Sequence, residues 1–147
     1  MRLLIPLLFA AFLLPAQTAD ERDAVAAVQR LFDAMTARDA AAIRASMIAD
    51  ARLYSVRDSG APATFTAADL ANNIAASKVP VLERFTAAPR VLVRNNMAQV
   101  WGEYEFLRDG KLNHCGVDSA SLFKTADGWK IASISFTTET TGCAPGK

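Results

Sequence analysis

The sequence predicts an α+β domain with helices in its first half and an antiparallel sheet in its second half. Two observations carry this prediction. Between residues 20 and 39, apolar residues recur at three- and four-residue steps, the spacing of a helix that buries one side. From Arg90 onward they recur at every second position, the spacing of a strand with one buried face. Helices followed by consecutive strands are typical of the α+β class.

Two helices are expected before the first strand. The first covers residues 20–39, and the second is a short helix over residues 40–47 with Asp39 as its N-cap, because an aspartate side chain can accept hydrogen bonds from free amides of the first turn. The apolar stripe of the first helix consists of Val25, Val28, Leu31, Phe32 and Met35.

A third helix is expected over residues 66–77. Thr66 followed by Asp69 three residues later has the spacing of a capping box, which marks the start of a helix. Pro80 limits this helix, and residues 81–85 are expected to add one more helical turn after it.

The strands and their turns follow from local patterns. An early strand is expected over residues 51–58, at one edge of the sheet, with a loop over residues 59–64. Asn95-Asn96 is expected to join two later strands in a tight hairpin. Two three-residue loops that end in glycine, 108–110 and 126–128, are expected to form type I turns with a glycine bulge.

These turns set pairing registers, and the registers bring apolar side chains onto one face of a four-stranded meander. The expected pairs include Val93 with Ala98, Tyr104 with His114, Gly102 with Gly116, Leu122 with Ala132, and Asp118 with Phe136. The apolar face then consists of Val91, Val93, Val100, Tyr104, Phe106, Leu112, Leu122, Ile134 and Phe136. We expect this face to pack against the helices.

The single histidine of the chain, His114, precedes one of its two cysteines, Cys115. Neighbouring residues on a strand point to opposite faces, so these two side chains cannot form a catalytic Cys–His dyad. No C-x-x-C spacing accompanies them, and no metal site is expected.

Polar groups on the apolar face indicate a pocket. Tyr104, His114 and Asp118 project from this face, and a largely apolar pocket with a few convergent polar groups is the default form of a binding site. The expected ligand-binding residues are Val100, Tyr104, Phe106, His114, Asp118 and Phe136. In the alternative interpretation, His114 lies at the polar rim of the core and hydrogen-bonds Tyr104, while Asp118 binds a helix N-terminus or a loop amide.

An N-terminal signal peptide is expected over residues 1–19. Arg2 precedes an apolar run, and the small residues of PAQTA follow it, in the order of a secretory leader. The run is too short for a membrane span, which needs about 20 apolar residues. Cleavage is expected after Ala19, with Ala16 and Thr18 as alternatives.

Residues 20–147 then form one exported domain, periplasmic or secreted. In such a compartment, Cys115 and Cys143 are expected to form a disulfide, with two free thiols as the alternative. The chain has a net charge of +1, and the leader contains only one charged residue, Arg2, so the mature domain is neutral. Neutrality and scattered charges predict no nucleic-acid partner and no membrane partner after signal cleavage. No phosphate-binding glycine loop is present in the sequence, and no cofactor is expected.

The second half also resembles a known family. The stretch VWGEYEFLRDGKLNHCGVDSASLFKTADGWKI, with a GC near the C-terminus, resembles exported members of the nuclear-transport-factor-two-like superfamily described as SnoaL-like or lumazine-binding. The resemblance extends over residues 24–143 and implies a cone fold, or cystatin-like roll, with helices on the concave face of a curved antiparallel sheet. It also implies a conical cavity and, in many members, a homodimer.

Three functions follow. The leading hypothesis is binding of a small apolar or aromatic molecule in the cone. The second is a cofactor-free isomerase, dehydratase or cyclase, since catalytic members of the resembling superfamily use Asp, His or Tyr inside the cone; His114, Asp118 and Tyr104 match by position. The third is a non-catalytic dimerisation or interaction module that uses the outer face of the sheet, with Trp101, Val117 and Phe123.

Overall fold

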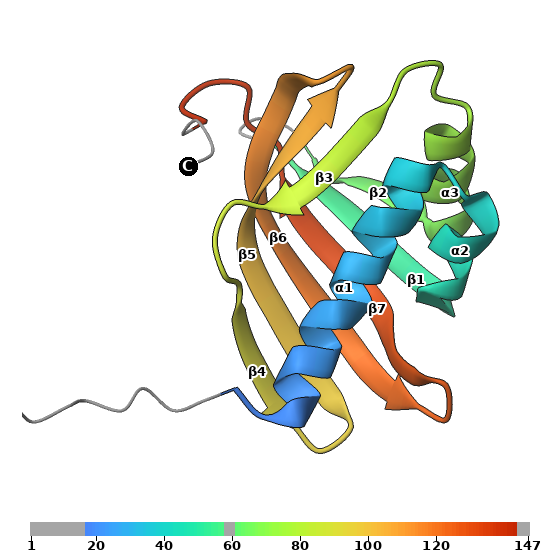
Figure 1. Ribbon diagram of the computed structural model, residues 1–147, viewed down its shortest axis with the longest axis vertical. Coiled ribbons are helices and arrows are strands. Elements are labelled where there is room, and N and C mark those ends of the chain that lie inside the picture. The colour runs from blue at the N-terminus through green and yellow to red at the C-terminus, as the bar shows by residue number, and fades with distance from the viewer. Residues whose placement is uncertain (1–16, 58–60, 144–147) are drawn as a thin grey trace, which may run out of the picture.

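A computed structural model describes residues 17–57 and 61–143 (Figure 1). The apolar run of the expected signal peptide, within residues 1–16, lies outside the described residues. In the described part of the chain, no helix is long and apolar enough to cross a membrane. The elements are α1 (Ala19–Ala37), α2 (Ala40–Ala45), β1 (Met47–Val56), β2 (Ala63–Thr66), α3 (Ala67–Ala75), β3 (Val81–Phe85), β4 (Arg90–Arg94), β5 (Met97–Arg108), β6 (Lys111–Thr125) and β7 (Gly128–Thr137).

One curved sheet with helices against one face confirms the predicted α+β class (Figure 1). The strand order is β2-β1-β7-β6-β5-β3, and β4 also pairs with β5. Strands β4 to β7 form the predicted antiparallel meander. The sheet as a whole is mixed, because β1 pairs with β7 in the parallel sense. The connection from β1 to β7 includes α3 and the rest of the sheet, which gives the chain the length that a parallel pair requires.

The predicted helix caps are present. Asp39 accepts hydrogen bonds from the amides of Ala41 and Ala42 at the start of α2. Thr66 and Asp69 form a complete capping box at the start of α3. A further capping box stands at the start of α1, where Thr18 is the N-cap and Glu21 its reciprocal partner.

Residues 81–85 form a strand, so the expected extra helical turn is wrong. β3 pairs antiparallel with β5, and Val81, Glu83 and Phe85 turn to the inner face while Leu82 and Arg84 are exposed. Five residues are too few to tell a helical turn from a strand by periodicity. β4 pairs only with the first half of β5, which leaves the second half free on the same edge. β3 pairs with this second half, and the pairing satisfies its backbone hydrogen-bonding groups.

The β4–β5 register is as predicted, whereas β5–β6 differs because of a bulge. The turn has two residues, Asp109 and Gly110, both with positive φ, so Arg108 pairs with Lys111. A shift between Phe106 and Leu107 then changes the register again. Beyond the bulge, the pairs are Phe106 with His114, Tyr104 with Gly116, Gly102 with Asp118 and Val100 with Ala120.

The two changes together displace the expected register by two residues, which leaves most side chains on the predicted face. Leu112 lies between the turn and the bulge, and it is 46% exposed rather than part of the apolar face. In the β6–β7 hairpin, Leu122 pairs with Ile131 instead of Ala132, and a bulge then restores the expected pair of Asp118 with Phe136.

The core lies between α1 and the inner face of the sheet. Its largest fully buried side chains are Phe32, Leu31, Val28, Ile43, Tyr104, Leu122, Ile131 and Val100. Five members of the predicted apolar face are buried in it, and Val91, Val93 and Phe136 pack against it.

The predicted disulfide joins Cys115 and Cys143, with 5.7 Å between their Cα atoms. Cys115 also forms an isolated bridge with Glu139, in the register that the hairpins predict. The segment after β7 is therefore held against β6 by two hydrogen bonds and a covalent bond.

Candidate functional site

A partly open cavity of about 170 Å³ lies between the helices and the inner face of the sheet. Its lining residues come from α1, α3, β1, β3, β5, β6 and β7. They are Leu31, Met35, Leu53, Leu70, Ile74, Glu83, Tyr104, Phe106, His114, Asp118, Ile134 and Phe136. Nine of these twelve side chains are aliphatic or aromatic, so the polar groups are three: Glu83, His114 and Asp118, beside the hydroxyl of Tyr104.

The structure brings five of the six expected ligand-binding residues to this cavity: Tyr104, Phe106, His114, Asp118 and Phe136. Val100 is fully buried and belongs to the core below the cavity, not to its lining. It pairs with Ala120 rather than with Asp118, the expected partner, because Asp118 pairs with Gly102, two residues after Val100 on β5.

Tyr104 uses its hydroxyl within the protein. The hydroxyl donates a hydrogen bond of 2.7 Å to the main-chain oxygen of Thr137, and not to His114. Burial, followed by the nearby Glu83 and Asp118 carboxyls, raises the pKa of Tyr104, so the phenol stays protonated. Its ring remains available as an apolar wall, but its proton is already engaged.

His114 lies among aromatic rings at the cavity. Its ring stacks on Phe106 with centroids 4.9 Å apart and meets Tyr104 edge-on at 5.8 Å. His114 Nδ1 lies 2.9 Å from Asn113 Oδ1, an acceptor, which assigns the proton to Nδ1 and leaves Nε2 as an acceptor. Burial lowers the pKa of His114, which favours the neutral ring.

Asp118 is the most deeply buried polar group of the cavity, with 3% exposure. Its Oδ2 atom has no hydrogen-bond donor among the described residues. Its polar neighbour is the carboxyl of Glu83, within hydrogen-bonding reach, rather than the helix N-terminus or loop amide of the alternative interpretation. Burial raises the pKa of Asp118 to about 7, and burial together with the Asp118 charge raises the pKa of Glu83.

Glu83 is the functional candidate that the sequence analysis missed. Two ionised carboxylates cannot hydrogen-bond each other, and the raised pKa values of Glu83 and Asp118 favour a proton on at least one of them. The signal was present in Val81, Glu83 and Phe85, an alternating set that faces inward once residues 81–85 form a strand. A helical turn over residues 81–85 does not alternate between two faces, so it does not place Glu83 on the apolar face of the sheet.

The two glycines that were expected to pair, Gly102 and Gly116, are in close contact with other protein atoms. A Cβ at Gly116 would overlap the main-chain oxygen of Thr137, and a Cβ at Gly102 would lie 2.8 Å from the ring of Phe85. These glycines therefore allow other segments to approach the sheet closely, and the hollow lies elsewhere on its inner face.

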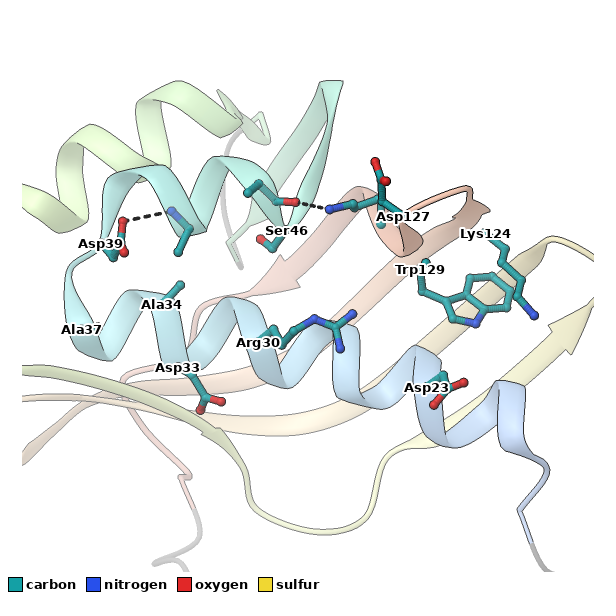
Figure 2. Close-up of a pocket in the computed structure, with 14 residues that line it drawn as sticks. Asp23, Arg30, Asp33, Ala34, Ala37, Asp39, Ser46, Lys124, Asp127 and Trp129 are labelled. Atoms are coloured by element: carbon teal, nitrogen blue, oxygen red, sulfur yellow. Dashed lines mark hydrogen bonds between the residues drawn. The ribbon is translucent and has the colours of Figure 1, made fainter.

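A larger and more open groove of about 770 Å³ lies between α1, α2 and the β6–β7 turn. Figure 2 shows Arg30 extending over it from α1, with Lys124 and Trp129 beside each other at its far end. Its charged side chains are mostly solvent-exposed, and several are engaged: Lys124 with Asp20 at 2.6 Å, and Lys130 with the main-chain oxygen of Ala45 at 2.6 Å. Of the groove's described side chains, the indole nitrogen of Trp129 is the one buried polar group without a hydrogen-bond partner, and its burial separates it from the open space.

Within the described residues, no group of three His, Cys, Asp or Glu side chains could hold a metal ion. The cavity carries only two carboxyls and one imidazole. The arrangement can hold and exchange a proton, accept hydrogen bonds at His114, and receive a positive or hydrogen-bonding group at Glu83 and Asp118.

No family model and no curated protein matches the sequence. Solved structures are similar in fold. A nuclear transport factor 2-like protein from Streptomyces avermitilis, provisionally described as a dehydratase, is 20% identical with a TM-score of 0.64, over 81% of this chain and 95% of that one. A cystatin-like-fold protein from Novosphingobium aromaticivorans is 15% identical with a TM-score of 0.65, over 86% of each chain.

A nuclear transport factor 2-like superfamily protein from Salmonella enterica is 14% identical with a TM-score of 0.64, over 86% of this chain and 96% of that one. The chain therefore has the nuclear transport factor 2-like, cystatin-like fold, and these similarities support the family at the level of fold. One fold of this kind supports many functions, so the function has to be argued from the cavity.

Proposed function

We propose that this protein binds a compact, largely apolar or aromatic small molecule in the cavity formed by the cone. The observation that carries the proposal is a largely apolar cavity of about 170 Å³ with a few convergent polar groups. Apolar cavities of about 150 Å³ admit benzene, so the ligand is on the scale of one ring with a small substituent. Phe106 and Phe136 supply contact area, and His114, Glu83 and Asp118 orient polar groups.

Native mass spectrometry of the purified protein tests this proposal, together with ligand-observed NMR on a set of one-ring fragments. We expect a retained mass that is released on denaturation, or fragment binding that is lost in Ile74→Phe, which fills the cavity. Leu92→Phe, on an exposed side chain outside the cavity, is the matched control and leaves binding unchanged. A folded protein that retains nothing and binds no fragment contradicts the proposal.

A second candidate function is cofactor-free acid–base catalysis of an isomerisation, dehydration or cyclisation. It is favoured by the pKa of about 7 at Asp118, since a catalytic acid or base works best near the operating pH. Asp118 would transfer the proton, with His114 as the second group and Glu83 as its proton-sharing partner. Deuterium exchange at the α-carbon of cyclohexanone, followed by NMR, tests it: we expect exchange that Asp118→Asn abolishes, and exchange equal to buffer excludes this chemistry for the probe.

A homodimer formed through the outer face of the sheet is the third candidate. Trp101 and Phe123 are 42% and 45% exposed there, and large exposed apolar side chains on one face are typical of interaction surfaces. Sedimentation equilibrium tests it: we expect a dimer that Trp101→Ser dissociates, while a monomer at all concentrations removes the candidate.

We also propose export of the chain, supported by the Cys115–Cys143 disulfide, since disulfides persist in oxidising compartments. The capping box of Thr18 and Glu21 favours cleavage after Ala16, one of the expected alternatives, because cleavage after Ala19 removes the cap of α1. The intact mass of the protein from the periplasmic fraction or medium measures the cleavage site. Retention of residues 1–16 there contradicts the signal-peptide assignment.

A further inference from the structure

We propose that the cavity selects an organic cation: a protonated primary amine on a single apolar ring, with its ammonium group between Glu83 and Asp118. This inference rests on the proposed binding function and names the chemical class of the ligand. It begins from Asp118, a carboxyl that is 3% exposed, lines the cavity, and has an oxygen without a donor among the described residues. A buried acceptor without a donor is costly, and an ammonium group carries three donors.

The second observation is the pairing of two acids without a cation. Glu83 faces Asp118 from β3, and the charge of Asp118 makes ionisation of Glu83 harder, while burial makes ionisation of Asp118 harder. Without a cation beside the pair, a proton held by the two acids relieves this conflict. An ammonium group placed between the two carboxyls relieves it in a different way, because it neutralises the charge that burial penalises and donates to both groups.

The other walls of the cavity offer no competing positive charge. From α1, α3, β1 and β7 the lining consists of Leu31, Met35, Leu70, Ile74, Leu53, Ile134 and Phe136, all apolar. From β5 and β6 come Tyr104, whose proton is bound to Thr137, and His114, whose ring is neutral. Among the described residues, no lysine or arginine lines the cavity, so an anionic ligand would meet two acids without a counter-charge from them.

Aromatic rings beside the acids suit the same ligand. Tyr104, Phe106 and Phe136 line the cavity together with the carboxyls. A desolvated ammonium is attracted to an aromatic face, and the ring of the ligand packs against the aliphatic side chains of the helices. A neutral alcohol also fits this space and could accept the shared proton, so the two ligand classes have to be separated by experiment.

The pH dependence of binding separates amines from neutral alcohols and ketones. An amine replaces the shared proton, so its binding releases protons near pH 7 and tightens as the pH rises from 6 to 8. An alcohol or ketone uses the proton, so its binding weakens over the same range. The amine itself stays charged throughout, because alkyl ammonium groups lose their proton only near pH 10.

Isothermal titration calorimetry of the full folded protein with benzylamine, benzyl alcohol and benzoate tests the inference. Measurements at pH 6 and 8, in two buffers of different ionisation enthalpy, give the proton count. At pH 8 we expect benzylamine to bind at least about tenfold more tightly than benzyl alcohol, with benzoate undetectable and up to about one proton released per amine at pH 7.

In Asp118→Asn we expect the preference for the amine to fall below about threefold while benzyl alcohol still binds. Glu83→Gln gives a second, independent loss of preference if the first variant does not fold. Benzyl alcohol that binds as tightly as benzylamine at pH 8, or amine binding that takes up protons, overturns the cation inference and leaves the binding function standing. No binding by any of the three probes to the folded protein contradicts the binding function itself.

Discussion

The two hollows of the molecule differ in a way that their sizes do not reveal. The open groove is the larger, about 770 Å³ against about 170 Å³, and it has several charged side chains. Those charges stand in solvent or contact protein partners, so they store little energy (Figure 2). The smaller cavity has two acids, of which Asp118 is buried and Glu83 is half-buried.

The candidate site is therefore distinguished by the burial of its acidic side chain Asp118 rather than by its volume. The aspartates of the groove are exposed to solvent, whereas Asp118 is buried and ionises only at a cost to the fold. Changes in the cavity should therefore alter stability and its pH dependence, and equivalent changes in the groove should not.

The largest expected effect is on the pH dependence of stability. The pKa of Asp118 rises from 3.8 in the unfolded chain to about 7 in the fold, so between pH 4 and 7 the folded state binds more protons than the unfolded state. The free energy of unfolding contributed by this group therefore falls as the pH rises through that window, by an amount on the order of 4 kcal/mol. Urea unfolding of wild type and Asp118→Asn from pH 4 to 8 measures it.

The lowered pKa of His114 acts in the opposite direction, because it gives stability that is lost as the pH falls below about 6.5. His114 is common to both proteins, so its contribution cancels in their difference. Asp23→Asn in the groove is the matched control, and it should leave the profile within about 0.5 kcal/mol of wild type. Parallel profiles for wild type and Asp118→Asn would show that Asp118 is an ordinary carboxylate.

The next effect concerns the disulfide next to the cavity wall, since Cys115 follows His114. A double replacement, Cys115→Ser with Cys143→Ser, opens a loop with a sequence separation of 28 and should lower the free energy of unfolding by roughly 3 to 4 kcal/mol. Thermal unfolding with and without reductant measures it. An unchanged melting temperature of the wild-type protein after reductant has reduced the disulfide to free thiols would contradict this estimate.

A change of about 1 to 3 kcal/mol is expected at Gly116. A methyl group there overlaps the main-chain oxygen of Thr137, which is backbone and cannot swing away. Displacement of Thr137 also disturbs the hydrogen bond from Tyr104, so Gly116→Ala should weaken ligand binding as well. Gly110→Ala cannot serve as the control, because Gly110 has positive φ and alanine would be strained there. Lys111→Ala, at an exposed position on the same strand, serves as the control. Equal stability of the two variants would contradict the close contact.

The smallest effect is expected for Tyr104→Phe, which removes one hydroxyl. The loss of the hydrogen bond to Thr137 should cost about 1 kcal/mol, with no loss of affinity for a one-ring ligand, because the hydroxyl is already engaged. Unfolding and fragment titration give the two numbers. A large fall in affinity with little fall in stability would return Tyr104 to the role of hydrogen-bond donor to the ligand.

Much of the fold could be predicted because its signals are local. Thr66 with Asp69, Asp39, and the Asn95-Asn96 turn each act over a few residues, and each appears where the sequence places it. The bulges could not be predicted, because one extra residue in β6 depends on how the strands twist together. His114 and Asp118 remain on the predicted face because the β5–β6 register is displaced by two residues, an even number.

The site was only partly predictable for the same reason. His114, Asp118, Tyr104, Phe106 and Phe136 lie on strands whose alternation was readable. Glu83 lies on a five-residue strand that gains its identity from pairing with β5, a contact between distant parts of the chain. The pair of Glu83 and Asp118 therefore arises from tertiary structure, and the local sequence around either residue does not predict it.

The claim that the cavity holds a proton-sharing pair of carboxyls is tested most directly by NMR titration. The side-chain carboxyl carbons of Asp118 and Glu83, labelled with ¹³C and assigned by the Asp118→Asn and Glu83→Gln variants, can be followed from pH 3 to 9. We predict that the pair titrates in two linked steps, with at least one near pH 7. Two independent titrations near pH 4, like those of exposed carboxyls, would contradict the account.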